Sequence, residues 1–318
     1  MSEQIVIFGY GAVGKATAER LVAAGRTVRV AQRRRPKDLV SGAGFVACDI
    51  ADAQAVARAI QGATQVVAAL GLPYSGKEWR RLWPTAMANL LAACRAAKAR
   101  LVFVDNLYMY GPQTAPLRED MPLTAYGVKP AVRSALTRQW MAASQAGDVL
   151  VAALRAPDFY GPGVGLSHIG DVGFGALAKN KRMILIIPPD IPHAFAYVPD
   201  VARAVVTLLD AADDAYGQAW HVPCAPSRTP REILSIGAKA LGVAPKISAL
   251  PLWLLPILGL ASPTLAEFAE MRFLLDRPYH VEGSKFAKRF WSDFTPIEVG
   301  AAQTAASFKA AASSASAR

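Results

Sequence analysis

Cysteines, long apolar runs and acidic residues are all scarce in this chain. Its three cysteines, Cys48, Cys94 and Cys224, lie far apart and show neither metal-ligand spacing nor an even disulfide set, so we expect no metal and no disulfide. The longest dense apolar run, Pro251 to Leu260, is broken by two prolines and has about half the length that spans a bilayer. We therefore expect no transmembrane helix. The N-terminus carries an acid where a secretion signal needs bases, which favours a cytoplasmic protein.

Bases outnumber acids in this chain. Its 35 Lys and Arg residues against 24 Asp and Glu give a formal net charge of +11. Such a balance raises the question of nucleic-acid binding, but the distribution of the charge matters more than its total. The densest basic cluster lies within residues 29–37, a single short stretch without interleaved aromatic side chains. We therefore expect no nucleic-acid partner.

Apolar side chains are abundant. Hydrophobic residues make up 53% of the 318 residues and charged residues 19%, which is enough for a deep core and too much for a disordered chain. This length is about twice that of a usual domain, so we expect either one large domain with an appended part or two domains. No internal repeat is present.

Six short apolar segments alternate with helical patterns through the first half of the chain. Strands that are apolar throughout and separated by helices indicate a parallel sheet that is covered on both faces, a doubly wound α/β fold. The expected strands are residues 5–8, 27–31, 44–47, 65–70, 100–104 and 149–154, and the expected helices are residues 12–24, 52–60, 77–99 and 130–146.

The pattern changes after Arg155. Loops rich in glycine and proline then mix with short helices, such as residues 199–209 and 230–241. Because loops commonly carry function, we expect residues 1–155 to form the main domain and residues 156–300 a smaller substrate-binding part interleaved with it, with later strands completing the sheet. Residues 301–318 are mostly Ala and Ser and are expected as a frayed helical tail.

A glycine-rich turn follows the first expected strand. Gly9, Gly11 and Gly14 form G-x-G-x-x-G between that strand and a helix, which is the context in which this motif cradles a pyrophosphate. Gly9 permits the tight turn, Gly11 lets the backbone approach the phosphates, and Gly14 lets helix and strand pack closely. Ala12 and Val13, the first helical residues, contribute free N–H groups. The motif predicts a Rossmann-type fold, with an ordinary glycine turn as the alternative.

The second expected strand ends without the acid that binds the ribose 2′-hydroxyl of NAD. Gln32, Arg33 and Arg34 stand there instead, and a guanidinium fork suits a 2′-phosphate. The sequence therefore favours NADP(H) over NAD(H), with a solvated surface run as the alternative for any single arginine. Asp49, after the third strand, faces the adenine or caps a helix, and Leu70 completes the expected cofactor-binding residues.

Three later segments carry a family resemblance. Residues 104–111 (VDNLYMYG) are similar to the motif S-S-x-x-V-Y-G, residues 155–163 (RAPDFYGPG) to R-P-x-x-x-Y-G-P-G, and residues 193–202 (HAFAYVPDVA) to h-x-x-x-V-x-D-V-A. With the glycine turn and Asp49, the chain resembles the extended or atypical short-chain dehydrogenase/reductase family, of the NAD(P)-dependent epimerase/dehydratase type. The resemblance implies nicotinamide binding and chemistry at a carbonyl or hydroxyl group.

The sequence departs from the catalytic motif of that family, a Tyr-x-x-x-Lys pair with a Ser or Thr. Asn106 stands at the position of the Ser or Thr, where it can donate a hydrogen bond to a carbonyl but cannot relay a proton. Tyr126 with Lys129 keeps the residue types, but the spacing is one residue short, and Pro130 disfavours helical geometry at Lys129.

A second register keeps the four-residue spacing and changes both residue types. It pairs Lys129 with Arg133, and we favour it slightly. Under this register the usual acid is missing, so the proton must come from Lys129, Tyr126 or Tyr108. In the family the lysine of the pair also holds the nicotinamide ribose, a role that the resemblance extends to Lys129.

Further candidates lie along the rest of the chain. Trp79 and Trp83 are four residues apart on an expected helix and either wall a pocket or pack in the core. Pro251 to Leu260, together with Met271 to Leu275, suggests an apolar lid or a homodimer surface, with burial as the default. The candidate substrate contacts are Tyr108, Tyr160, His193 and His168, and for each histidine a surface or core position is the commoner outcome.

These expectations converge on an NAD(P)-dependent oxidoreductase or epimerase/dehydratase-like protein. It would act on a carbonyl or hydroxyl of a small organic substrate, with a degenerate Tyr–Lys motif. A catalytically silent protein of the same fold, which binds NADP(H) as a sensor or holds a partner protein, is the alternative that the degenerate motif leaves open.

Overall fold

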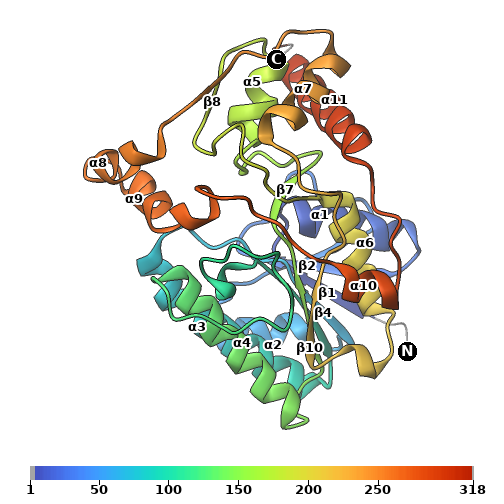
Figure 1. Cartoon of the computed structure of the whole chain (residues 1–318). Coiled ribbons are helices and arrows are strands. Elements are labelled where there is room, and N and C mark those ends of the chain that lie inside the picture. The colour runs from blue at the N-terminus through green and yellow to red at the C-terminus, as the bar shows by residue number, and fades with distance from the viewer. Residues whose placement is uncertain (1–3, 317–318) are drawn as a thin grey trace. The chain divides into compact units, whose positions relative to one another are not determined.

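The central sheet of the protein is parallel and seven-stranded. In the computed structural model, which describes residues 4–316, all its neighbouring strands pair in parallel, in the order β10-β6-β5-β4-β1-β2-β3. Figure 1 labels β1, β2, β4 and β10 of this sheet. Its strands are β1 (Gln4–Phe8), β2 (Thr27–Gln32), β3 (Gly44–Ala47), β4 (Gln65–Ala68), β5 (Arg100–Asp105), β6 (Val151–Arg155) and β10 (Gln218–His221).

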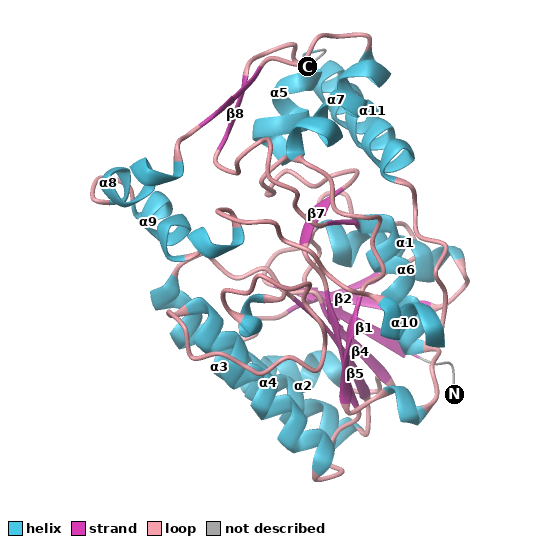
Figure 2. Ribbon diagram, viewed as in Figure 1, coloured by secondary structure: helices cyan, strands magenta, loops and turns pink. Residues whose placement is uncertain are grey.

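Helices cover both faces of this sheet. Figure 2 shows α2, α3 and α4 on one face, with α1 and α6 on the other. Consecutive strand residues such as Val66 and Val67, or Val102 and Phe103, are 0% exposed, because their side chains point to opposite faces and both faces are covered. The helices are α1 (Ala12–Ala23), α2 (Ala53–Ile60), α3 (Gly76–Ala97), α4 (Lys129–Gln145) and α6 (Val198–Leu209), with short turns η1 (Tyr108–Tyr110) and η3 (Asp213–Ala215). The predicted doubly wound Rossmann-type fold is confirmed.

The chain divides into two compact units that interleave along the sequence. Unit 1 comprises the residues up to 111, 119–155 and 201–222, and so holds the whole central sheet. Unit 2 comprises residues 112–118, 156–200 and those from 223 onward. The seventh strand, β10, was not among the six strands located from sequence, because its short run of mixed residues carries no strong apolar signal.

Unit 2 is built from short elements. Strand β7 (Asp158–Tyr160) pairs in parallel with β9 (Phe195–Tyr197), and β8 (Met183–Leu185) with β11 (Ile247–Ala249). Its helices and helical turns are η2 (Gly170–Gly175), α5 (Ala176–Ala178), α7 (Pro230–Leu241), η4 (Leu252–Leu254), α8 (Leu255–Gly259), α9 (Pro263–Glu270), η5 (Arg272–Leu274), α10 (Ser284–Arg289) and α11 (Ile297–Ser316).

Two late segments differ from the sequence expectation. The Ala/Ser-rich tail forms most of α11, which packs along α7 and buries Ala301 and Ala305; residues 317 and 318 lie outside the described residues. Within Pro251 to Leu260 only Leu255 is buried, whereas the companion segment Met271 to Leu275 is largely buried. No helix among residues 4–316 is both long and apolar enough to cross a membrane.

Candidate functional site

The glycine turn between β1 and α1 packs too closely for side chains at two of its three glycines. Gly9 has a φ of +92°, and a Cβ there would lie 2.4 Å from the carbonyl oxygen of Ala69. A Cβ on Gly14 would lie 2.0 Å from the carbonyl oxygen of Gly9. At Gly11, in contrast, a Cβ would meet no protein atom within 4 Å. The protein's own packing therefore does not require glycine at position 11, and the close approach of a ligand would explain it.

Helix α1 begins directly after Gly11, and no acidic side chain in its first turn neutralises the partial positive charge at its N-terminus. Gly11 is the N-cap residue, no side chain caps the helix, and its first turn contains no acid. The first N–H groups of a helix and its partial positive charge favour an anion at such an end. Ala12 and Val13 start the helix as the sequence predicts, and the arrangement suits a pyrophosphate.

A hydrogen-bonded loop holds the arginines that follow β2 against this turn. The side-chain oxygen of Gln32 accepts a hydrogen bond from the Tyr10 N–H at 3.1 Å, and its amide nitrogen donates to the Arg34 carbonyl at 2.7 Å. The Tyr10 hydroxyl accepts from the Val40 N–H at 2.9 Å, and Lys15 of α1 pairs with Asp38 of the loop. Gln32 stands at the position of the missing acid and links the glycine turn to the loop of residues 33–43, which we name the arginine loop.

A cavity of about 680 Å³ lies beside the turn, a size typical of small-molecule sites. It brings together Gly9, Arg33, Arg34, Asp49 and Leu70, all predicted as cofactor-binding. The other predicted cofactor-binding residues are not among its lining residues: Gly11, Ala12, Val13, Gly14 and Lys129. Asp52, rather than Asp49, caps α2. Among the lining residues that the sequence did not predict are two charged ones, Arg81 and Glu78, which pair with each other on α3 at 2.7 Å.

The residues predicted for catalysis in the segment 126–133 lie at and just before the start of α4. Lys129 is the first residue of the helix and is fully buried, and its Nζ lies 4.8 Å from the centre of the Tyr74 ring. Arg133 follows one turn later, and its guanidinium lies 3.8 Å from the Trp83 ring centre. Tyr126 precedes the helix and is 46% exposed. The structure thus brings Lys129 and Arg133 onto one helix face and leaves Tyr126 outside the helix.

Aromatic rings surround the Arg133 guanidinium. Trp79 also lies beneath it, at 4.7 Å, and Tyr108 stacks on Trp79 with ring centres 6.1 Å apart. Trp79 and Trp83 are 4% and 1% exposed, so both pack in the core. Cation–π contacts of this kind hold a guanidinium in place where water is excluded.

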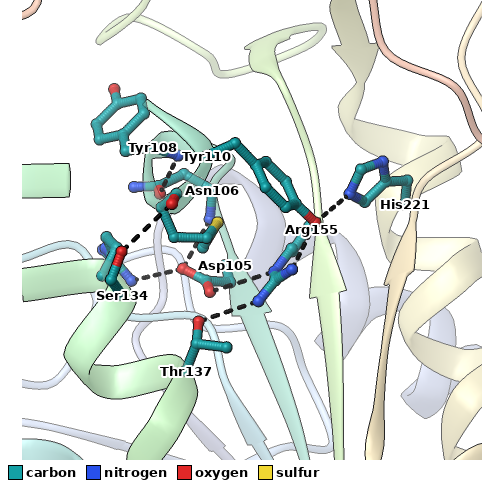
Figure 3. Close-up of polar contacts among 10 residues, drawn as sticks. Asp105, Asn106, Tyr108, Tyr110, Ser134, Thr137, Arg155 and His221 are labelled. Carbon is teal, nitrogen blue, oxygen red and sulfur yellow. Dashed lines mark hydrogen bonds and ion pairs between the residues drawn. The ribbon is translucent and has the colours of Figure 1, made fainter. Parts of the chain in front are cut away.

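The carboxylate of Asp105, at the end of β5, is shared by two buried arginines (Figure 3). Arg133 Nη1 donates to Asp105 Oδ1 at 2.9 Å, and Arg155 Nε lies 3.9 Å from Asp105 Oδ2. All three side chains are at most 6% exposed. Burial raises the pKa of the Asp105 carboxyl, while the two guanidiniums oppose the rise. The same Oδ1 accepts from the Asn106 N–H, and Asn106 Oδ1 in turn accepts from the Tyr108 N–H.

The network continues from Arg155 to strand β10. Arg155 Nη1 donates to the Tyr110 hydroxyl and Nη2 donates to Thr137 Oγ1, while the Tyr110 oxygen lies 2.8 Å from His221 Nε2 (Figure 3). Burial raises the pKa of Tyr110 to about 12, so this hydroxyl stays neutral and serves as a hydrogen-bonding group. Asp105, Arg155 and His221 were not among the predicted site residues, and the family-like motifs around the first two were the available signal.

Unit 2 gathers the predicted histidines around one carboxylate. His193 Nε2 lies 2.7 Å from Asp158 Oδ2, and His168 Nε2 lies 3.5 Å from the same oxygen. Burial lowers the pKa of His168, with Asp158 opposing. Tyr160 is only 2% exposed, and burial raises its pKa above the usual range. No group of His, Cys, Asp or Glu side chains within residues 4–316 is arranged to hold a metal ion.

Comparisons with known proteins agree with this fold. The UDP-glucose 4-epimerase of Thermus thermophilus, solved in complex with NAD, is 21% identical with a TM-score of 0.76, over 97% of this chain and 99% of that one. The dTDP-glucose 4,6-dehydratase of Bacillus anthracis, also with NAD, is 14% identical with a TM-score of 0.79, over 97% of each chain. WbmG of Bordetella bronchiseptica, with NAD and UDP, is 17% identical with a TM-score of 0.75, over 98% of this chain and 96% of that one.

No curated protein sequence matches the chain significantly, but one family model does. The model of the NAD dependent epimerase/dehydratase family matches residues 5–222, which include the glycine turn, the arginine loop and the buried charge cluster of Asp105, Arg133 and Arg155. The chain belongs to the NAD dependent epimerase/dehydratase family.

Proposed function

We propose that this protein is an NADP(H)-dependent oxidoreductase or epimerase that acts on a carbonyl or hydroxyl group of a small organic molecule. The observation that carries the proposal is the cavity beside the glycine turn, where Arg33, Arg34 and Arg81 line the wall and Gln32 ends β2 in place of an acid. The guanidiniums of Arg33 and Arg34 favour the ligand with the additional phosphate, whereas that of Arg81 is paired with Glu78.

The residues present fit a dinucleotide. Gly11 leaves open space for a pyrophosphate at the uncapped start of α1, and the hydrogen bonds of Gln32 hold the arginine loop next to that turn. Asp49 and Ile50 line the part of the cavity that would receive the adenine. When bound, NADP(H) would supply or accept a hydride, and the chain's own residues would have to move the accompanying proton.

Lys129 is our proposed proton donor and acceptor. It stands one helical turn before Arg133, and its ammonium group is buried over the Tyr74 ring. In a reduction, one N–H proton of Lys129 would pass to the substrate oxygen as the carbonyl carbon accepts the hydride. Arg133 is held by Asp105 and two indole rings, so it serves as a positioning residue for this helix face. Asn106 would orient the carbonyl by hydrogen bonding.

One observation favours a second candidate, a silent NADP(H)-binding sensor. Tyr126, which keeps the residue type of the family's acid in the short-spaced register, lies outside α4 and is 46% exposed. If Lys129 cannot replace it, the protein would retain cofactor binding without turnover.

A titration tests the cofactor proposal. Wild-type protein should bind NADPH more tightly than NADH, measured by quenching or enhancement of intrinsic fluorescence. The double change Arg33→Ala with Arg34→Ala should weaken NADPH binding about a hundredfold and NADH binding much less, because charge-assisted hydrogen bonds to the 2′-phosphate are lost. Arg20→Ala with Arg58→Ala, two exposed arginines outside the cavity, is the matched control. Equal losses for both cofactors in the first pair would refute the NADP(H) preference.

A further inference from the structure

One surface of unit 2 is apolar and uncovered. Residues 247–266 contain no charged side chain and run from β11 through η4 and α8 into α9. Within this segment, all of which the structure describes, only Leu255 is buried. Trp253, Ile257 and Leu260 are 64%, 55% and 90% exposed. Monomeric proteins rarely leave large apolar side chains together in water, so such a surface indicates a partner.

The three exposed side chains lie close together along the chain: Trp253 in the turn η4, Ile257 in α8, and Leu260 at the C-cap of α8. Their spacing, four residues and then three, is that of one face of a continuous helix. Helices α8 and α9 pack against each other, and Figure 1 shows them as a hairpin at the edge of unit 2, reached from β11. We name Trp253, Ile257 and Leu260 the apolar tip.

A basic fringe adjoins the start of this segment, and the first acids beyond the segment are Glu267 and Glu270 of α9. The Met183 N–H donates to the Lys246 carbonyl at 2.8 Å, and Arg182 Nη1 donates to Ser248 Oγ at 2.9 Å, which brings the chain before β8 next to the chain before the apolar tip. Lys181, Arg182 and Lys246 are all exposed. Neither residues 172–189 nor residues 233–266 contain an Asp or Glu. We name Lys181, Arg182 and Lys246 the basic fringe. The two stretches of chain that carry these residues therefore contain no acid.

We propose that the apolar tip and the basic fringe together form a docking surface for an anionic lipid membrane. Trp253, Ile257 and Leu260 would enter the interface between headgroups and acyl chains, where tryptophan is favoured, while Lys181, Arg182 and Lys246 contact the anionic headgroups. The protein would lie on the membrane surface, with the apolar tip as its anchor.

Charge favours a lipid surface over a second copy of the chain. A symmetric dimer places the same patch of both subunits face to face, so it would bring the two basic fringes toward each other. Like charges at such a contact repel, whereas an anionic membrane attracts every one of these cations. The overall charge of +11 acts in the same direction.

Vesicle flotation with the full chain tests the proposal. The protein should float with vesicles of phosphatidylcholine mixed with phosphatidylglycerol at low salt, float less at high salt, and float poorly with phosphatidylcholine alone. Trp253→Ser with Leu260→Ser should weaken this binding about tenfold or more, because the buried apolar area is lost. Lys181→Gln with Lys246→Gln should weaken binding to the mixed vesicles about tenfold.

Two controls separate the docking surface from general stickiness. Val299→Ser, which removes an exposed apolar side chain of α11, and Lys98→Gln with Lys288→Gln should leave flotation unchanged. Every variant should keep the wild-type affinity for NADPH, which shows that it is folded. The proposal is overturned if no vesicle recruits the wild-type protein, or if the apolar-tip variant floats as well as wild type. It is also overturned if that variant only converts a dimer to a monomer in sedimentation, in which case the tip is the homodimer surface.

Discussion

At the scale of single residues, the three glycines of one motif are present for different physical reasons. Gly9 and Gly14 are required by the backbone, since a Cβ at either would overlap a carbonyl oxygen of the protein itself. Gly11 has open space around it and a φ of −75°, which any residue adopts. The motif's spacing predicted all three, but only the structure separates the two that hold the fold from the one that leaves room for a ligand.

This difference leads to a prediction for Gly11. Gly11→Val should leave the circular dichroism spectrum and the melting temperature close to wild type, yet weaken NADPH binding about a hundredfold or more, because the side chain occupies the space of the pyrophosphate. Gly14→Val is the contrasting variant and should be destabilised by about 1–3 kcal/mol or more through overpacking. Unchanged NADPH affinity in Gly11→Val would mean that the phosphates bind elsewhere.

The two candidate proton donors, Lys129 and Tyr126, lead to opposite expectations for their variants. Lys129→Met keeps the stem and removes the ammonium group, so kcat should fall about a hundredfold or more on any carbonyl substrate found by screening, as expected for a lost general acid. Tyr126→Phe should have a mild effect, because this half-exposed residue lies outside α4.

The reverse ranking of these two variants would support the Tyr126 register instead. Full activity in both, with a substrate turned over by wild type, would place the proton donor elsewhere, with Tyr108 as the remaining candidate. If screening finds no NADPH-dependent turnover while the cofactor binds, the silent sensor becomes the better description.

At the scale of elements, the sequence predicted those strands and helices that local residue patterns encode. Expected and observed bounds of the six early strands agree closely, and α7 begins at Pro230 as predicted, where Thr229 and Glu232 form a reciprocal cap. The expectation that Pro130 disfavours helical geometry at Lys129 was wrong, because α4 begins at Lys129 and proline is tolerated in the first helical turn. The association of Asp105 with Arg133 and Arg155 could not be predicted, because it joins β5, α4 and β6, and no local spacing reports a contact between residues so far apart in sequence.

That buried charge cluster should be sensitive to the loss of its single carboxylate. Asp105→Asn keeps the volume but leaves two guanidiniums buried without a counter-charge, so urea unfolding should show a loss of about 3–5 kcal/mol. The matched control is Asp210→Asn, which removes the partner of Arg26 at a pair whose acid is 57% exposed and should cost less than about 1 kcal/mol. Asp105→Leu combined with Arg133→Met should recover part of the stability. Similar losses in both single variants would contradict the importance of burial here.

At the scale of the whole molecule, each compact unit is built from stretches that are separated along the chain. Unit 1 takes its last strand and most of α6 from residues 201–222, well beyond the boundary at residue 155 that the sequence pattern suggested for the main domain. The pattern changes at Arg155 because the loops of unit 2 begin there. Later strands were expected to complete the sheet, but the pattern did not locate the one that does, β10.

The returning segment should be indispensable to unit 1. Strand β10 covers the edge of β6, whose residues Val151 to Leu154 are 0% exposed, and it brings His221 to the Tyr110 hydroxyl. A fragment of residues 1–155 would expose that apolar edge, which favours aggregation, and should show no cooperative thermal transition by circular dichroism. A fragment of residues 1–222 restores the strand and should melt cooperatively and bind NADPH. If the shorter fragment melts cooperatively and binds NADPH as well as the longer one, residues 201–222 add nothing to the folding of the cofactor-binding unit.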